Sequence, residues 1–348
     1  MKDGSLPPSP STQPPALPQA GLYDRQKDLI QKFAAFGGLV LLMIVFSITS
    51  RAFMTVDNAL TVSLQVTSIA ILGIGATCVI ITGGIDLSVG SIVALAGVSA
   101  ALVVKAGAPV WLGMFVGILV GSACGFLNGL AVTRLRLPPF IATLGMMMVA
   151  RGLALQITGA RAVSGLGQGF GVLGNGSLFR VESIGSDGFP NVAFPGIPYP
   201  VIIMIVLAIL VSLMLTRTVL GRHIYSVGSN SEAARLSGVN VARVTQFTYV
   251  LSGTLAGLTG CILMSRLVTG QPNEGIMYEL DAIAAAVIGG TSLIGGVGTI
   301  SGTAIGSFVI GILRNGLNMN GVSAFTQQII IGLVILFTVW IDQLRNRR

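Results

Sequence analysis

Long apolar blocks, separated by short polar segments, make up most of the chain. The blocks are Phe33–Thr49, Asn58–Lys105, Pro109–Thr133, Phe140–Thr158, Tyr199–Thr216, Gln246–Val268, Leu280–Leu313 and Phe325–Ile341. Because one crossing of a bilayer takes about 20 residues, the blocks that begin at Asn58 and Leu280 must each hold two helices. The pattern predicts an all-α, polytopic membrane protein with about ten transmembrane helices.

The same two blocks are interrupted by similar glycine-rich motifs. The first reads GGIDLSVG over residues 83–90, the second reads GGTSLIGG over residues 289–296, and both fit G-G-x-[DS]-L-x-x-G. Repeated breaks in corresponding halves of a membrane protein are typical of a duplicated transporter core. We therefore expect two related halves, with short or broken helices in the second block. The motif leaves open whether the halves are parallel or inverted.

The longest charged island, residues 221–243, lies between two strongly apolar blocks. Ser229 and Glu232 have the spacing of a capping box, and Gly238 stands where a glycine often ends a helix. We expect one helix of about two turns that docks on a soluble partner. An ordinary solvated loop is the alternative. The expected docking residues are Ser229, Asn230, Glu232, Ala233, Ala234, Arg235 and Gly238.

The composition excludes a soluble globule and does not favour a nucleic-acid partner. With 53% hydrophobic and 9% charged residues, the chain has too little polar surface for a soluble protein of 348 residues. The net charge of +8 comes from Lys and Arg that flank apolar spans rather than cluster with aromatic residues. Ten crossings with the N-terminus inside leave most of these positive residues in the cytoplasm, which supports cytoplasmic N- and C-termini by the positive-inside rule.

The predicted organisation is a single membrane domain with polar ends. Residues 1–32 form a Pro-rich cytoplasmic tail, residues 33–342 form the transmembrane domain, and residues 343–348 form a basic cytoplasmic tip. Within the domain we expect a cytoplasmic loop at residues 217–245 and an external loop at residues 159–198.

Asp86 is the most informative polar residue, because a carboxylate inside an apolar block is costly unless it is paired, hydrated or capping a helix. One interpretation is that Asp86 caps a half-helix beginning at Leu87, and a second is that it faces a translocation path. Arg151 either extends outward to the membrane surface or faces the bundle interior. Further polar side chains either line a path or join helices, and the candidates for the path are Asp86, Ser88, Ser91, Asn128, Thr143 and Arg151.

Signs of catalysis or cofactor binding are weak. The GxGxxG match at residues 169–174 lies in the external loop without a preceding strand, and the chain has no GxxxxGK[ST] motif. His223 has no neighbouring acid or cysteine suited to a metal site or a triad. The three cysteines lie in apolar blocks without metal-ligand spacing. We expect no enzyme and no bound cofactor or metal.

Several stretches carry a specific resemblance. They are GIDLSVGS at residues 84–91, PPFIATL at 138–144 with Arg151 and Gly152, GRHIYSVGSNSEAARLSGVNV at 221–241, and SRLVTGQPNEGIMYELDAIAAAVIGGTSLIGGVGT at 265–299. The chain resembles the permease subunits of bacterial ABC importers for monosaccharides, the ribose, arabinose and xylose group.

The resemblance implies a dimeric inner-membrane permease that works with two other proteins. A cytoplasmic ATPase would bind ATP and Mg²⁺, and a periplasmic protein would bind the sugar. Residues 229–238 would be the coupling helix received by the ATPase, and residues 86–91 would lie near the translocation path. The rival hypotheses are a secondary transporter that uses Asp86 as an ion or proton site, and a membrane scaffold without transport.

Overall fold

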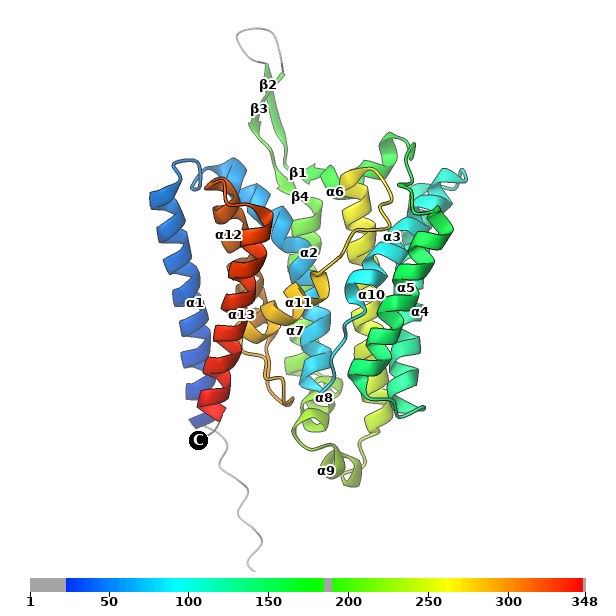
Figure 1. Ribbon diagram of the computed structural model, residues 1–348, viewed down its shortest axis with the longest axis vertical. Coiled ribbons are helices and arrows are strands. Elements are labelled where there is room, and N and C mark those ends of the chain that lie inside the picture. The colour runs from blue at the N-terminus through cyan, green and yellow to red at the C-terminus, as the bar shows by residue number, and fades with distance from the viewer. Residues whose placement is uncertain (1–22, 185–189, 347–348) are drawn as a thin grey trace, which may run out of the picture.

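The apolar blocks of the sequence become upright helices that pack into one bundle (Figure 1). The computed structural model describes residues 23–184 and 190–346. The helices that correspond to the blocks are α1 (Tyr23–Thr49), α2 (Val56–Ile81), α3 (Val89–Lys105), α4 (Val110–Thr133), α5 (Pro139–Thr158), α7 (Tyr199–Arg217), α10 (Val241–Leu267), α11 (Tyr278–Ile288), α12 (Ile300–Met319) and α13 (Ala324–Asn346). The two longest blocks hold two helices each, as predicted.

The prediction of an all-α, polytopic membrane protein is confirmed, whereas the count of ten crossings stays a prediction. Among the described residues, six helices are long and apolar enough to cross a bilayer, namely α2, α4, α5, α7, α10 and α12. The other helices have shorter apolar stretches: α3 has 17 residues and α11 has only 11. At about 1.5 Å per residue, α11 reaches roughly half-way through the hydrocarbon core of a membrane.

The ends of the chain differ from the expected boundaries. Helix α1 begins at Tyr23, so residues 23–32, which the sequence analysis placed in the Pro-rich tail, are helical. The rest of that tail lies outside the described residues. Helix α13 continues through Asn346, so most of the expected basic tip also belongs to a helix.

Both glycine-rich motifs end a helix in the same way. Gly83, with φ of 80°, follows α2, and Gly290, with φ of 94°, follows α11. In both places the N–H of the next residue donates to a carbonyl five residues back, which is the hydrogen bond of a Schellman motif. Gly83 therefore corresponds to Gly290, one residue later than the sequence motif suggested.

The two breaks also contact each other. The N–H of Gly296 in the second break donates to the carbonyl of Ile81 at the first, at 2.8 Å. Helices α2 and α11 run toward this contact, and α3 and α12 run away from it (Figure 1). The two helix–break–helix units therefore point in the same direction.

Helices α4 and α10 cross at very short range because glycines line both faces. A Cβ atom on Gly121 would overlap the carbonyl of Gly253, and one on Gly253 would overlap the carbonyl of Gly121. Gly125 and Gly257 extend the same contact by one turn on each helix. Small residues spaced four apart allow backbones in a membrane to approach closely.

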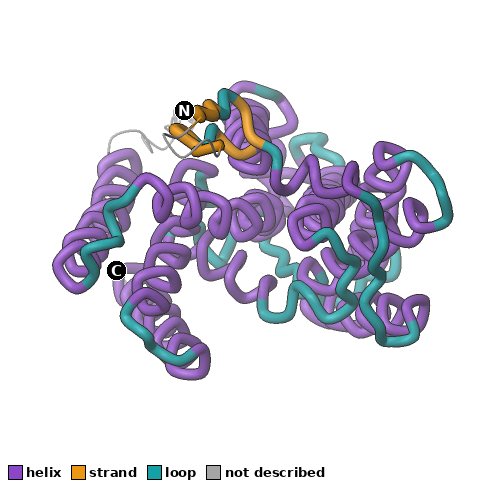
Figure 2. Tube along the Cα trace, turned by 90° about the horizontal axis from the view of Figure 1, so that it is seen from above, coloured by secondary structure: helices purple, strands orange, loops and turns teal. Residues whose placement is uncertain are grey.

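The region between α5 and α7 carries small structured elements at one end of the bundle, which we call the hairpin end. They are η1 (Gln168–Gly171), α6 (Val172–Asn175), β1 (Ser177–Leu178) paired with β4 (Ile197–Pro198), and β2 (Val181–Ile184) paired with β3 (Pro190–Phe194). Seen from this end, the strands gather over one edge of the bundle (Figure 2). The Ser265 hydroxyl of α10 donates to Phe170 O at 2.6 Å and accepts from Gly174 N at 2.8 Å. The GxGxxG match is thus an anchoring segment and has no strand–turn–helix setting.

Two short helices, α8 (Val219–Ser229) and α9 (Ser231–Leu236), lie at the opposite end, which we call the α9 end (Figure 1). The sequence analysis predicted one helix here and left residues 219–228 as loop, which is wrong. Gly221, Ile224 and Val227 of α8 are buried. Because this spacing of three places them on one face, α8 is an amphipathic helix held against the bundle.

Candidate functional site

The first candidate site is α9, whose N-cap differs from the predicted one. Asn230 is the cap: its backbone is extended, and its Oδ1 atom accepts from the N–H of Ala233 at 2.9 Å. Ser229 is instead the last residue of α8, and Glu232 is therefore one position too early for a capping box. Asparagine caps helices as well as serine does, so the local sequence alone did not distinguish the two residues.

The predicted end of α9 at Gly238 is confirmed, whereas its docking on a partner stays a prediction. Gly238 has φ of 85° and follows the helix as its C′ residue. The Arg235 guanidinium donates to the Glu232 carboxylate at 2.6 Å, and this neighbour holds the pKa of Glu232 below its ordinary value. Ala234 is buried against the rest of the chain, while Ala233 is exposed. The exposed side of α9 thus carries a small residue, Ala233, and an ion pair whose two charges cancel.

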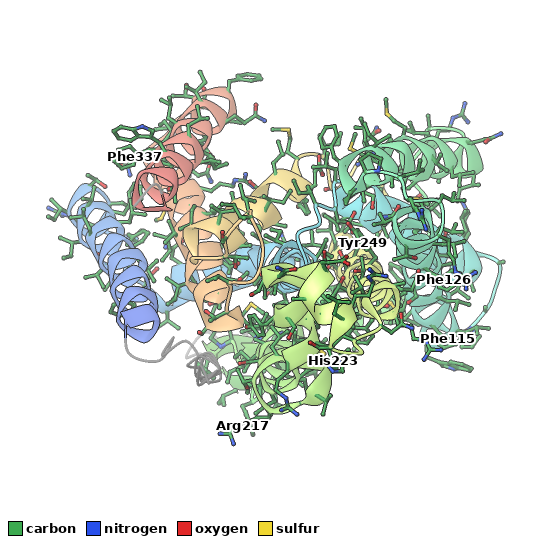
Figure 3. All side chains as sticks on the ribbon, turned by 90° about the horizontal axis from the view of Figure 1, so that it is seen from below. Phe115, Phe126, Arg217, His223, Tyr249 and Phe337 are labelled. Atoms are coloured by element: carbon green, nitrogen blue, oxygen red, sulfur yellow. The ribbon has the colours of Figure 1, made fainter. Side chains whose placement is uncertain are left out.

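Helix α8 links α9 to both glycine-rich breaks. A Cβ atom on Gly228 would overlap the carbonyl oxygen of Ile81 and would lie 2.6 Å from the nitrogen of Gly296. The Tyr225 hydroxyl donates to Gly298 O at 2.7 Å. Figure 3 shows α8, marked by His223, at this end of the bundle. A movement of α9 would therefore reach the two breaks through backbone contacts.

The second candidate site is a buried polar network around Asp86, which is 2% exposed. One carboxylate oxygen of Asp86 accepts from the N–H and the hydroxyl of Ser88, at 3.0 and 2.6 Å. The other oxygen accepts from the Ser252 hydroxyl of α10 at 2.9 Å. Asn128 of α4 donates to the Ser88 hydroxyl at 2.8 Å. The network fixes the first break to α4 and α10.

The interpretation of Asp86 as the cap of a half-helix beginning at Leu87 is wrong, because α3 begins at Val89, its N-cap is Ser88, and no side chain caps it. Asp86 instead accepts from the N–H of Ser88, two residues further on, as in an Asx-turn before the helix. Thr143 of α5 donates to the carbonyl of Ile85 in the same break, at 3.2 Å, and Ser91 is buried in the first turn of α3. A role for these residues in translocation stays a prediction.

Arg151 of α5 faces the interior and not the membrane surface. Its Nη1 atom donates to the carbonyls of Pro272 and Glu274, at 2.7 and 2.8 Å, in the segment between α10 and α11. The guanidinium thus satisfies two carbonyl groups of irregular backbone. Irregular backbone within a membrane requires hydrogen-bond partners of this kind, because no water is available there. Arg151 is separate from the Asp86 network.

Asp281 of α11 and Arg314 of α12 form an ion pair that the sequence analysis missed. Both Asp281 carboxylate oxygens accept from Arg314 Nη2, at 3.0 and 3.2 Å. The Asp281 side chain is 6% exposed and that of Arg314 is 37% exposed. The sequence feature that drew attention to Asp86, a carboxylate within an apolar block, is also present at Asp281 and could have identified it. Arg314 directly follows the apolar block Leu280–Leu313, and in the structure it lies within the bundle beside a polar cavity.

Replacing Asp86 by asparagine should preserve folding, because the amide oxygen still accepts from Ser88. Replacing it by alanine leaves Ser88 and Ser252 without their buried acceptor and should cost about 1–3 kcal/mol of stability. Thermal unfolding of the purified variants, together with uptake in vesicles, checks both statements. An asparagine variant that folds normally but does not transport would contradict the assignment of Asp86 to a chiefly structural role.

A family model described as "Branched-chain amino acid transport system / permease component" matches residues 58–339. The match runs from the first turn of α2 into α13 and covers most of the chain. The chain belongs to this permease family. Both breaks, the Asp86 network, α8 and α9 therefore lie within the residues that the family model matches.

Individual relatives cover nearly the whole permease. The ribose import permease protein RbsC of Bacillus subtilis (strain 168) is 42% identical, over 91% of this chain and 94% of the relative. RbsC of Escherichia coli (strain K12) is 41% identical, over 87% and 91%. The xylose transport system permease protein XylH of the same strain is 34% identical, over 98% and 99%. No solved structure matches the permease.

Proposed function

We propose that this permease is the membrane-spanning subunit of an ATP-driven importer for a monosaccharide in the bacterial inner membrane. A cytoplasmic ATPase binds ATP and Mg²⁺ and supplies the energy, and a periplasmic binding protein delivers the sugar. Two permease chains form a dimer. The α9 end and both termini lie in the cytoplasm, and the hairpin end faces outward.

The observation that carries this proposal is the construction of α9. This helix is capped at both ends, lies outside the membrane bundle, and is tied through α8 to both breaks. A short rigid helix with a small exposed residue suits insertion into a groove of a soluble partner. Arg217, Arg222 and Arg243 stand near it, which supports a cytoplasmic position for this end.

The names of the relatives support a sugar as the substrate. RbsC of two organisms is named a ribose import permease and XylH a xylose transport permease, whereas the family description names branched-chain amino acids. The relatives are individual proteins that are 34–42% identical over 87–98% of this chain, whereas the description applies to the whole family. We therefore propose a ribose-like pentose or a related monosaccharide.

The test is a bulky residue on the docking surface of α9. Replacing Ala233 by tryptophan should block the ATPase groove, because Ala233 is exposed and a tight helix-in-groove fit has no room for an indole. A clash at the centre of an interface costs about 2 kcal/mol or more, which corresponds to roughly 30-fold in affinity. Co-purification of the ATPase and binding-protein-stimulated ATP hydrolysis should both fall.

The matched control is Ala59→Trp, at an exposed alanine near the start of α2, toward the other end of the bundle. Both variants should reach the membrane in normal amounts, since neither site is in the packed core. Full uptake and full ATPase binding by Ala233→Trp would overturn the proposal that α9 is the coupling helix.

A secondary transporter driven by protonation of Asp86 is the alternative. It has less support, because both Asp86 oxygens are already occupied by hydrogen bonds from Ser88 and Ser252. The alternative requires uptake that collapses with a protonophore at constant ATP. Our proposal requires uptake that is lost when the ATPase is removed.

A further inference from the structure

A polar cavity opens among the helices in the half of the bundle nearer the hairpin end. Its volume is about 340 Å³, near the lower limit of about 300–1,000 Å³ for small-molecule pockets. Residues of α2, α10, α11, α12 and α13 surround it. The polar lining residues are Gln65, Ser68, Arg266, Tyr278, Arg314, Asn315, Asn318 and Gln327, and the others are Ile69, Gly311 and Ala324. Polar side chains predominate in a domain that is otherwise strongly apolar.

Several of these side chains have no hydrogen-bond partner among the described residues. Gln65, Ser68, Tyr278 and Asn318 make no side-chain hydrogen bond to another described residue. Ser68 is the clearest case, because the residue is only 6% exposed, and it lines the cavity. A hydroxyl group that faces a cavity is free to bond to water or to a ligand there. These groups supply hydrogen bonds that the protein itself leaves unused.

Other lining side chains are held in place from behind. Arg314 is fixed by Asp281, Asn315 exchanges two hydrogen bonds with Asn58 at 3.0 and 3.1 Å, and the Gln327 amide donates to Val322 O at 2.8 Å. Each keeps further donors or acceptors for a ligand. A set of amide and guanidinium groups with fixed positions discriminates between ligands better than mobile side chains do.

The lining also distinguishes between ligand classes. A branched-chain amino acid needs an apolar pocket for its side chain and a free carboxylate for its ammonium group. Here Ile69 and Ala324 are the apolar side chains, none of the lining residues carries a carboxylate, and Asp281 beside the cavity is already paired with Arg314. A neutral molecule with several hydroxyl groups can use the amides, Ser68 and Tyr278 together.

We propose that this cavity within a single permease chain is a binding site for a neutral monosaccharide. The inference rests on the proposed function and adds the place where the sugar binds. The sugar enters from the hairpin end and bonds to Ser68, Asn318 and the amide groups around them. The site lies apart from the Asp86 network and is formed by the second break unit, α11 and α12, against α2.

Protection from chemical labelling tests the site without depending on transport. We would place a cysteine at Asn318, which is exposed and lines the cavity, and label it with a maleimide in lipid nanodiscs. The native cysteines Cys78, Cys124 and Cys261 are buried, so they contribute little background. The matched control is Asn320→Cys, which is exposed two residues further on and outside the lining. We expect ribose or xylose to slow labelling at position 318 and not at position 320.

A second variant ties the protection to the cavity itself. Adding Ser68→Ala to Asn318→Cys removes a hydroxyl that bonds to no described residue, so folding should be unaffected. The sugar concentration that gives half-protection should rise about 2–13-fold, the usual effect of one net hydrogen bond. The matched control Ser63→Ala, on the same helix but outside the lining, should leave this concentration unchanged.

The outcomes separate this site from the proposed function. Equal protection at positions 318 and 320, no protection by either sugar, or protection by leucine alone would each overturn the site. If the complete transporter with its ATPase and binding protein still takes up sugar in that case, the proposed function stands. Loss of ATP-dependent sugar uptake in the unmodified transporter would instead overturn the function.

Discussion

Replacing Arg314 by alanine is expected to destabilise the permease by about 3–5 kcal/mol, because it leaves a buried carboxylate without its partner. The Asp281 side chain is 6% exposed, and Arg314 is the residue that donates to it. After the change, only the position of Asp281 in the first turn of α11 would still stabilise its charge. The measurement is thermal unfolding of the purified protein.

Replacing the other partner, Asp281, by alanine should destabilise the protein less than Arg314→Ala does. This difference between the two single variants is the most specific part of the prediction. In Asp281→Ala, the remaining Arg314 side chain is 37% exposed and faces the polar cavity, where water can solvate it. The double variant Asp281→Leu with Arg314→Met should recover much of the stability, because well-packed apolar residues often replace a buried ion pair without loss. Equal destabilisation by the two single variants would contradict this account of the pair.

Replacing Gly228 by alanine is expected to uncouple α9 from the membrane helices. The added methyl group would overlap the Ile81 carbonyl and press on Gly296, so α8 must move away from both breaks. Overpacking of this kind costs about 1–3 kcal/mol, which would shift a two-state equilibrium about 5–150-fold. Uptake and binding-protein-stimulated ATP hydrolysis should fall, while the ATPase should still co-purify, because α9 is unchanged.

The matched control for Gly228→Ala is Gly145→Ala in α5. A Cβ atom at Gly145 would meet no other atom within 4 Å, so this change should be tolerated. Size-exclusion profiles and thermal unfolding distinguish loss of coupling from loss of folding. Normal stimulated hydrolysis by Gly228→Ala would show that the contact of α8 with the breaks does not transmit the movement of α9.

Several local features, such as helix ends and side-chain pairs within one helix, could be predicted because they depend only on residues close together in the sequence. Gly83 and Gly290 each end a helix in a left-handed conformation that other residues adopt at a cost. Gly238 does the same after α9, and Glu232 and Arg235 meet because three residues bring side chains to the same side of a helix. The apolar blocks located the helices because a bilayer requires continuous apolar length.

Other features depended on packing that the local sequence does not encode. Whether Ser229 or Asn230 caps α9 was decided by α8, which continues through Ser229 because its apolar face packs on the bundle. The direction of Arg151 was decided by two carbonyl groups more than 100 residues away in the chain. Hydrophobic periodicity could not predict which side of a membrane helix faces the bundle interior, because a helix that is apolar on all sides has no distinct apolar face.

The sequence by itself determined that this protein crosses a membrane many times, that two of its long apolar blocks break at glycine pairs, and that a short capped helix stands outside the membrane. Only the tertiary structure decided that the two breaks meet under Gly228, that Asp281 pairs with Arg314, and that five helices enclose a polar cavity. The physical reason is that each of these contacts depends on how far helices rotate and how closely they cross. Those quantities are set by the packing of whole faces against one another, and single residues along the chain do not fix them.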